Sequence, residues 1–506
     1  MGSGFRASMN GLHTWAGVTV GALLFSIFWM GTLAVFDAEI DRWMIPETRL
    51  AATTEPLSVD RLWHQEPPPP GSGVWSVRLP TDRNPTAEVR LRGPDGRWRA
   101  RTIDPATGRT LPPAGSLAGT GFVYPFHVHL HLRSFEIGYW IVGFCGMAML
   151  LLIVSGVAVH RRIFADFFLF RTERKATRGV LDLHNVTGVL ALPFHVMIAL
   201  SGLVIFLSIY YPGVRAVLYA GDDRAYYAEA FGTNSYARPR QGRPAGTASL
   251  DAIVASARAA WGGDAASTVT VHHPHDAAGY VRVGRSTEAM VPYNRDHISF
   301  DAVDGSMLAR YERTGASAVQ RFVAGLHFLQ FRHWTLRWLY FALGLSGCVM
   351  IATGYVFWLG ARRKRLASDG AIGFRVVAAL TVGAVCGIVL GTLAFLVANR
   401  LLPPGARALG QDRAALEVWS FFLAWTASLA HAWLRPDRAW LEQCRATAAL
   451  AVAAALLNWV TTGDHLARTL GHRHLWPIAG MDLVLLAGAA TAMLAARSLA
   501  RRRPAP

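Results

Sequence analysis

Two stretches of the chain, 12-LHTWAGV-18 and 183-LHNVTGV-189, share one pattern, and each opens a long apolar run. In both stretches the histidine is followed four residues later by a glycine. A further glycine comes eighteen residues after each histidine, at Gly31 and at Gly202. Self-similarity of this kind indicates an internal repeat, here one that begins with a long apolar helix.

The repeat extends to a second helix in each copy. Leu130-His131 precedes Ser155-Gly156 in the first copy, and Leu326-His327 precedes Thr353-Gly354 in the second. A long polar segment with strand and turn signals separates the two helices of each copy. The repeating unit is therefore a helix, a small α+β segment and another helix.

The composition places these helices in a membrane. Of the 506 residues, 52% are hydrophobic and only 16% are charged, whereas a soluble chain carries about 25% charged residues. A helix needs about 20 apolar residues to cross about 30 Å of hydrocarbon. We count eight such runs: 14–36, 137–159, 185–210, 335–360, 374–398, 415–434, 446–462 and 476–496. These long apolar runs and the low share of charged residues exclude the possibility that the chain is one large soluble enzyme.

The positive charge is distributed as in a membrane protein, which argues against a nucleic-acid partner. The net charge of +17 comes largely from arginines at the ends of the apolar runs, and Lys and Arg in short loops mark the cytoplasmic side. We therefore expect a multi-pass protein of a bacterial inner membrane, with both termini in the cytoplasm and the polar segments in the periplasm. The basic residues assigned to the cytoplasmic side are Arg161, Arg162, Arg171, Arg174, Lys175, Arg178, Arg362, Arg363, Lys364, Arg365, Arg435, Arg438, Arg445, Arg497, Arg501, Arg502 and Arg503.

The sequence predicts an all-α membrane bundle of about eight transmembrane helices. Two small periplasmic α+β domains are expected between helices 1 and 2 and between helices 3 and 4. The C-terminal four helices do not repeat the pattern. The expected boundaries are 1–36 (first helix), 37–125 (first periplasmic domain), 126–162 (second helix), 180–211 (third helix), 212–325 (second periplasmic domain), 326–362 (fourth helix) and 371–498 (C-terminal region).

These motifs resemble the PepSY-associated transmembrane-helix family. The resemblance rests on the L-H-x-x-x-G opening, on the D-x-x-T-G turn at 104–108 with its weaker match at 301–305, and on the L-H entry to the next helix, and it covers residues 1–366. The family includes iron-regulated inner-membrane proteins and ferric-siderophore reductases that bind haem. The resemblance implies two PepSY-like periplasmic domains and haem b, bound without a covalent link because the chain has no C-x-x-C-H motif.

The repeated histidines are the candidate haem ligands. Two axial histidines leave no open position on a haem iron, which favours electron transfer over oxygen chemistry. His13 and His184 are equivalent at the cytoplasmic entry, and His131 and His327 are equivalent at the periplasmic entry. If a pseudo-two-fold axis runs along the membrane normal, each pair meets across it, which gives two haems. The alternative is that these are interfacial histidines that cap helices.

Other residues extend or compete with this assignment. His195 lies eleven residues after His184, nearly on the same helix face, and is either a further ligand or a core histidine bonded to a carbonyl near Pro193. His129 is the reserve for His131. With His127 they form a His-x-His-x-His run, for which the alternative is a metal site on a strand, because period two puts all three side chains on one face. Arg133 and Arg332 follow the periplasmic pair and either hold haem propionates or anchor the interface.

No flavin or nucleotide site is evident in the sequence, so the electron donor is expected to be a quinol or a soluble reductase. Together these observations favour a haem-dependent oxidoreductase that transfers electrons to ferric iron, as a ferric siderophore or another ferric chelate, and so releases the iron. Two alternatives remain open. One is a transporter for a siderophore, haem or metal, and the other is a non-catalytic PepSY sensor that binds a periplasmic partner.

Overall fold

The computed structural model describes residues 3–53, 57–160, 176–232, 236–313, 315–366 and 372–501. The chain divides into two compact units. The helical unit consists of residues 1–46, 115–203 and 334–506, and the sheet unit consists of residues 47–114 and 204–333. The basic loop residues 161–175, which support the orientation predicted above, lie outside the described residues.

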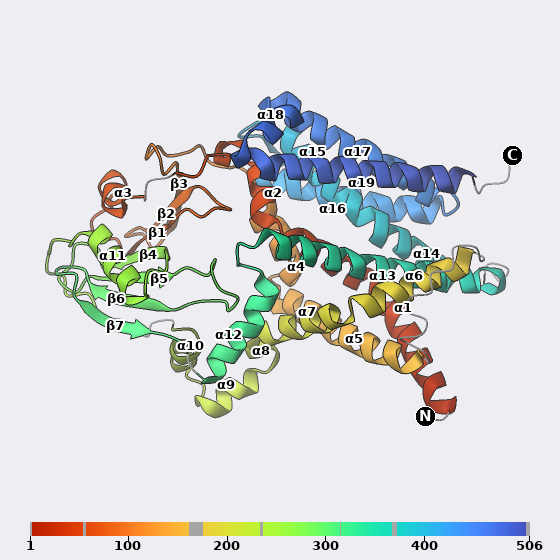
Figure 1. The fold of residues 1–506 in the computed structure, drawn as a ribbon, viewed down its shortest axis with the longest axis horizontal. Helices are drawn as coiled ribbons and strands as arrows, with labels where there is room; N and C mark the ends of the chain where they lie inside the picture. Colours follow the sequence, from red (N-terminus) through yellow and green to blue (C-terminus); the bar gives the residue numbers. More distant parts are fainter. Residues whose placement is uncertain are drawn as a thin grey trace. The chain divides into compact units, whose positions relative to one another are not determined.

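Five helices carry the repeat (Figure 1), and they are α1 (Ser3–Ala34), α5 (Ile137–Val159), α6 (Ala176–Leu190), α7 (Leu192–Ile205) and α13 (Trp334–Leu366). α1 packs against both α5 and α13, and α13 packs against α6. α1 and α13 run antiparallel, because Gly21 faces Tyr355 while Phe28 faces Gly347. The two copies of the repeat therefore share one bundle.

The third predicted span is bent. α6 and α7 form an angle of 64° at a short break, where the sequence predicts one continuous helix over 185–210. Pro193 is the second residue of α7. Its missing N–H and its ring together disrupt the helical hydrogen bonding at this point.

The C-terminal part of the helical unit contains α14 (Ile372–Val382), the π-helical turn η4 (Gly383–Gly387), α15 (Ile388–Leu401), α16 (Arg413–Leu434), α17 (Ala439–Thr462), α18 (Leu466–Gly471) and α19 (Trp476–Arg501). α17 and α19 lie side by side (Figure 1). α2 (Asp37–Met44) packs against α19 and α15. Trp43 on α2 donates to the Asp482 carboxylate at 2.8 Å, which fixes this contact inside the unit.

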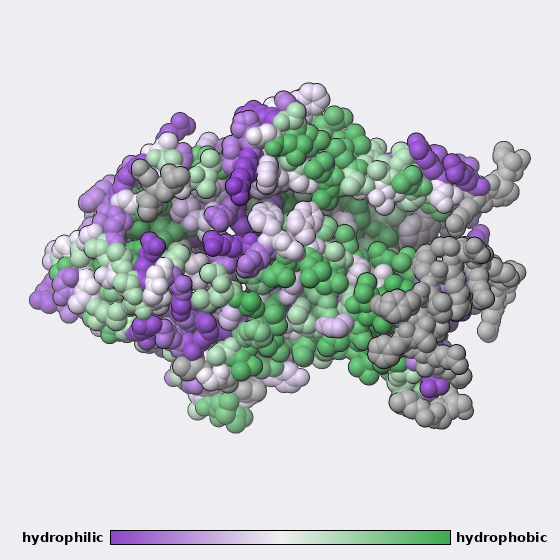
Figure 2. Space-filling view, viewed as in Figure 1, coloured by the Kyte–Doolittle hydropathy of each residue, from purple (hydrophilic) through white to green (hydrophobic). Residues whose placement is uncertain are grey.

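Six described helices are long and apolar enough to cross a membrane, or seven if the bent pair is one span. All eight predicted runs are helical, but α16 is not among these candidate spans. Three tryptophans, two serines, Glu417 and His431 lower its hydropathy. Apolar side chains cover the helices on the face drawn in Figure 2, and exposed side chains such as Val154, Leu423 and Val460 suit contact with lipid.

The sheet unit contains one antiparallel seven-stranded sheet in the order β3-β2-β1-β4-β5-β6-β7. Its strands are β1 (Val74–Arg78), β2 (Ala87–Arg92), β3 (Trp98–Ile103), β4 (Ala266–His272), β5 (Tyr280–Arg285), β6 (His297–Asp301) and β7 (Met307–Tyr311). α3 (Val59–Gln65) and α11 (Leu250–Ala260) contribute to the sheet's apolar core, which includes Trp75, Val271 and Phe300.

The remaining elements are short. In the helical unit they are η2 (Gly119–Val123), α4 (Tyr124–His129), η3 (Ser134–Glu136) and η5 (Arg473–Leu475). A small β8–β9 hairpin (Arg407–Ala408 and Gln411–Asp412) precedes α16. In the sheet unit they are α8 (Leu207–Tyr210), α9 (Pro212–Leu218), α10 (Asp223–Phe231) and α12 (Gly315–Phe328). A further 3-10 turn, η1, covers Pro46–Thr48.

The sequence predicts two separate small domains, and this is wrong, because the two polar segments form one continuous sheet. β1 of the first segment pairs with β4 of the second along its whole length, with Val74 opposite His272 and Arg78 opposite Thr268. Each segment alone presents an edge strand with unpaired backbone groups. Pairing the two edges satisfies those groups.

The two helices on the sheet cap each other. The Asp251 carboxylate of α11 accepts from the Ser58 hydroxyl and the Val59 N–H at the start of α3, each at 2.6 Å. The Asp60 carboxylate of α3 accepts from the Ser249 hydroxyl and the Leu250 N–H at the start of α11, also at 2.6 Å. A carboxylate at a helix N-terminus satisfies free N–H groups and complements the helix dipole.

The reciprocal capping of α3 and α11 predicts that substitutions of Asp60 and Asp251 have coupled effects on the stability of the sheet unit. We expect Asp60→Ala and Asp251→Ala each to cost about 1–2 kcal/mol in the free energy of unfolding of the sheet unit. The double variant should deviate from additivity by more than about 0.5 kcal/mol, because the two helices pack together. Denaturant unfolding followed by tryptophan fluorescence measures both. Asp95→Ala, at an exposed surface pair with Arg99, is the control, and an equal effect there would contradict the capping role.

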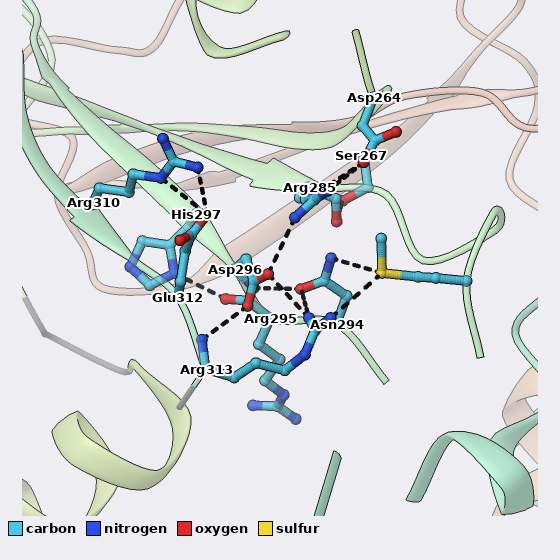
Figure 3. A network of polar contacts seen from close by, with 11 residues as sticks. Asp264, Ser267, Arg285, Asn294, Arg295, Asp296, His297, Arg310, Glu312 and Arg313 are labelled. Atoms are coloured by element: carbon cyan, nitrogen blue, oxygen red, sulfur yellow. Dashed lines mark hydrogen bonds and ion pairs between the residues drawn. The ribbon is translucent and has the colours of Figure 1, made fainter. Parts of the chain in front are cut away.

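A polar network lies where the chain leaves β7 toward α12 (Figure 3). The Asp296 carboxylate accepts from Arg313 at 3.0 Å and pairs with Arg285 at 3.5 Å. Asn294 accepts from both the Asp296 N–H and Arg313. The next residue, His297, is buried, donates from Nδ1 to the Arg295 carbonyl and stacks on Tyr311.

Burial of His297 predicts a pH dependence. Burial lowers the pKa of His297 to about 4, whereas an unfolded histidine has a pKa of about 6.5. Between these values the unfolded state binds the extra proton, so this histidine's contribution to stability is lost as the pH falls from about 6.5 to about 4, by up to about 1.4 kcal/mol per pH unit.

Hydrogen exchange of the β6 amides at pH 7 and pH 5, corrected for intrinsic rates, measures this loss of protection. His297→Gln should flatten the dependence, and His275→Gln, at an exposed position, is the control. The same pH dependence in His297→Gln and in the unsubstituted chain would be the contrary result.

Candidate functional site

The structure brings His13 and His184 together. Their ring centroids lie 6.3 Å apart, with the ring planes at 78°. His13 comes from α1 and His184 from α6, the opening helices of the two repeats. This is the pair that the repeat in the sequence indicates for the cytoplasmic entry.

A backbone carbonyl of the second helix in each repeat orients each imidazole. His13 Nδ1 lies 3.0 Å from the Leu152 carbonyl of α5, and His184 Nδ1 lies 2.7 Å from the Met350 carbonyl of α13. A carbonyl only accepts, so each Nδ1 carries the proton, and each Nε2 keeps its lone pair. A neutral imidazole held in this way is a ready metal ligand through Nε2.

Two glycines allow the rings to approach their partner helices. A Cβ at Gly156 would lie 3.1 Å from His13 Cε1, and a Cβ at Gly354 would lie 3.2 Å from His184 Cε1. Ser155, beside the first glycine, also lies 3.2 Å from His13 Nδ1 through its hydroxyl. The Ser/Thr-Gly motif of the repeat therefore has a packing role that the sequence reasoning did not assign.

The two imidazoles alone fit only a metal whose other coordination positions are already filled, such as haem iron. A metal lies about 2 Å from an imidazole nitrogen that binds it, so two imidazoles on opposite sides of one metal have centroids roughly 6 Å apart. Among the described residues, no group of three or more His, Cys, Asp or Glu side chains could hold a metal ion. A bare zinc site needs at least three protein ligands, whereas haem iron needs only axial ligands.

Comparison with known proteins agrees with this repeat. The model of the PepSY-associated transmembrane region matches residues 11–361. The chain belongs to this family. It is also 28% identical, over 363 residues, to an uncharacterized protein of Pseudomonas aeruginosa, a match that covers 68% of this chain and 86% of that protein.

The family match of this PepSY-associated transmembrane protein ends before its last helices. α14 begins at Ile372, eleven residues beyond the match. The C-terminal helices are therefore additional to the part that defines the family, as the sequence predicts from their lack of a repeat.

His195 is fully buried on α7; its ring nitrogens make no close hydrogen bond among the described residues, and the Leu343 carbonyl of α13 is a weak partner. Its ring lies 6.0 Å from that of Phe28, and a Cβ at Gly347 would lie 3.1 Å from its Nε2. The bend between α6 and α7 separates it from His184, so the rotation expected of one straight helix does not apply. The equivalent position in α1, Leu24, is packed in an apolar cluster.

The second predicted pair is divided between the two units. His131 lies in the helical unit and His327 on α12 in the sheet unit. His131 Nε2 lies 2.9 Å from the Phe122 carbonyl, and its ring stacks on Phe122 at 4.8 Å. The pairing of His131 with His327 stays a prediction.

The reserve residue His129 fits the repeat better than His131. His129 and His327 each lie 26 residues before the Ser-Gly or Thr-Gly motif of their own copy. His129 is buried, and its Nδ1 has no partner among the described residues. It ends helix α4, so the strand expected for the His-x-His-x-His run is wrong. Pro125 in the first turn of that helix is the signal that could have shown this.

The arginines proposed for propionates are exposed. Arg133 lies at the turn before α5, and Arg332 pairs with Asp82 at 3.7 Å across an exposed surface. Their roles stay predictions. His127, the first histidine of the His-x-His-x-His run, has Nδ1 2.9 Å from the Ile27 carbonyl of α1.

The His13–His184 geometry generates a prediction about haem content. We expect His13→Ala and His184→Ala each to lower the haem per chain from about two to about one, because each variant leaves the same iron one protein ligand. The double variant should lose no more than either single one, as for residues that act as a unit. Pyridine haemochrome assays of the purified variants measure this. His472→Ala is the exposed control, and full haem content in both single variants would reject the pair.

Proposed function

We propose that this protein is a haem-dependent oxidoreductase of the bacterial inner membrane that transfers electrons to ferric iron. The observation that carries the proposal is the His13–His184 pair, with each Nδ1 on a backbone carbonyl and each Nε2 available. Iron with two axial histidines supplies one-electron transfer, because no coordination position stays open for oxygen.

The residues of the chain bind and orient. His13 and His184 would hold the first haem b through Nε2, and the Leu152 and Met350 carbonyls fix the ring orientation. His327 with His129 or His131 is the proposed second ligand set. His195 is the proposed further ligand on α7, and its full burial with no close hydrogen bond supports that role.

The proposed substrate is a ferric siderophore or another ferric chelate in the periplasm. Hard oxygen ligands bind Fe(III) more strongly than Fe(II), so reduction weakens the chelate and releases iron. In this proposal both termini lie in the cytoplasm, and the donor is a quinol or a soluble reductase. The sheet unit then lies on the substrate side. Its segment 78–109 holds eight Arg against four Asp and Glu, and this excess of positive charge attracts anions.

The first test is the colour of the protein. Protein purified from haem-replete cells should be red, with the reduced-minus-oxidised spectrum of six-coordinate b-type haem. In proteoliposomes that enclose a reductant, it should then accelerate the formation of Fe(II) from an external ferric siderophore, trapped by a ferrous chelator. Empty liposomes and the His13→Ala/His184→Ala variant are the controls. A colourless preparation would reject the oxidoreductase and leave the transporter or the sensor.

A further inference from the structure

Four polar residues meet where α16 ends and α17 begins. His431 Nε2 lies 2.8 Å from the Glu442 carboxylate. The Gln443 side-chain nitrogen lies 2.8 Å from the Ser428 carbonyl and 3.3 Å from His431 Nδ1. We call Ser428, His431, Glu442 and Gln443 the α16–α17 polar site. All four lie beyond residue 361, where the family match ends.

The hydrogen bonds of the site fix the proton of the imidazole. A carbonyl only accepts, so the side-chain nitrogen of Gln443 points at the Ser428 carbonyl, and its second N–H donates to His431 Nδ1. His431 therefore carries its proton on Nε2 and donates it to Glu442. Arg435 lies 3.3 Å from the other Glu442 oxygen and balances its charge. The imidazole is neutral, and only a long bond occupies its Nδ1 lone pair.

Two atoms of the site are buried without a hydrogen-bond partner among the described residues. They are the oxygen Oε1 of Gln443, which is 3% exposed, and the hydroxyl of Ser428, which is 5% exposed. On neighbouring helices the hydroxyls of Thr381 and Thr392 donate to the carbonyl one turn earlier. A buried acceptor and a buried hydroxyl that bond nothing cost free energy, so they indicate a bound group.

The helix next to α16 makes room for the Ser428 hydroxyl. A Cβ at Gly387, the last residue of η4, would overlap Ser428 Oγ. Trp425 of α16 donates to the Gly383 carbonyl at the start of the same π-helical turn, at 2.9 Å. Such turns inside α-helices are frequent at functional sites. The glycine and the turn therefore hold α16 close to η4 while the hydroxyl stays unbonded.

The site lies near the level of His13 in the helical unit. Trp29 of α1 donates to Thr392 of α15 at 3.0 Å, and α14, which precedes α15, also packs against α1. α1 is too short beyond Trp29 to meet α14 in the opposite direction, so the helices are parallel. His13 lies sixteen residues before Trp29, and Arg375 lies seventeen before Thr392, which sets them nearly level. Arg375 lies 4.6 Å from the centroid of the Trp433 ring, at the end of α16.

We propose that the α16–α17 polar site binds the head group of a membrane quinol, the electron donor. This inference rests on the proposed function. A quinol hydroxyl both donates and accepts, which matches an amide oxygen and a serine hydroxyl. Trp433 and Leu434 beside the site are exposed apolar side chains, so a lipid-soluble molecule reaches it from the bilayer. A soluble reductase has no such access to atoms buried between helices.

The site also supplies the base that quinol oxidation needs. Oxidation to the quinone breaks two O–H bonds and releases two electrons and two protons. The electrons reduce two ferric ions, one each. One proton goes to His431 Nδ1, and the imidazolium that forms pairs with Glu442. The other goes to water, because His431 and Glu442 are each about 30% exposed.

The test follows haem reduction by decylubiquinol, a short-chain quinol, in the haem-containing protein in detergent. We expect Gln443→Leu and His431→Gln each to slow the reduction about tenfold, the effect of about one lost hydrogen bond. Dithionite should still reduce the haem of both variants fully, which separates the quinol site from damage to the haem. His472→Gln, at an exposed histidine, is the control and should keep the rate. If Gln443→Leu fails to fold by circular dichroism, His431→Gln decides.

A photoreactive azidoquinone tests the site without relying on haem. Its crosslinks, mapped by mass spectrometry, should fall on α16 or α17 and be displaced by decylubiquinone. Such crosslinks in a colourless protein would support the quinol site and reject the proposed function. Rates within twofold of the unsubstituted protein in both variants would overturn the site, and so would crosslinks confined to other helices. Water or a lipid would then be the group that bonds Gln443 Oε1.

Discussion

The hydrogen bond between an imidazole N–H and a helix carbonyl is the constraint on which the helical unit depends. A histidine inside an apolar bundle loses free energy when its N–H stays unbonded, because no water replaces a missing partner. The Leu152 and Met350 carbonyls meet this need for His13 and His184. A carbonyl has a second lone pair, so it can accept this bond while it stays in its helix. The bond also sets the tautomer and leaves each Nε2 able to bind a metal.

The repeat is symmetric around His13 and His184 and asymmetric elsewhere. Gly156 and Gly354 give both histidines the same close approach to a neighbouring helix. By contrast, the first copy fills its central position with Leu24 and the second with the fully buried His195. The second copy is also the one that bends, at Pro193. The two halves of the bundle are therefore specialised for different contacts.

The sequence was sufficient to predict the features that depend on local patterns. The helical runs and the repeat follow from spacing, and the meeting of His13 with His184 follows from the repeat once a pseudo-two-fold axis relates its two copies. The β1–β4 pairing does not, because strands almost 200 residues apart in the chain meet there and period-two patterns do not name a partner strand. The reciprocal caps of Asp60 and Asp251 follow from that same long-range pairing.

Two other differences between the predictions from the sequence and the structure have local causes. The bend lies at Pro193, whereas the length of the apolar run around this proline favours one continuous helix. The choice of His131 over His129 came from matching a Leu-His dipeptide, whereas the distance to the Ser-Gly motif favours His129. A dipeptide is a weaker guide to the alignment of the two repeats than the number of residues between two motifs of the same copy.

The central claim is that one haem iron joins the two repeats. Cryo-electron microscopy of protein purified with its native haem tests this most directly. The account predicts planar density between α1 and α6, with iron bonded to Nε2 of His13 and Nε2 of His184, while each Nδ1 stays on its carbonyl. A haem ligated elsewhere, or two imidazoles with no density between them in a haem-containing preparation, would contradict it.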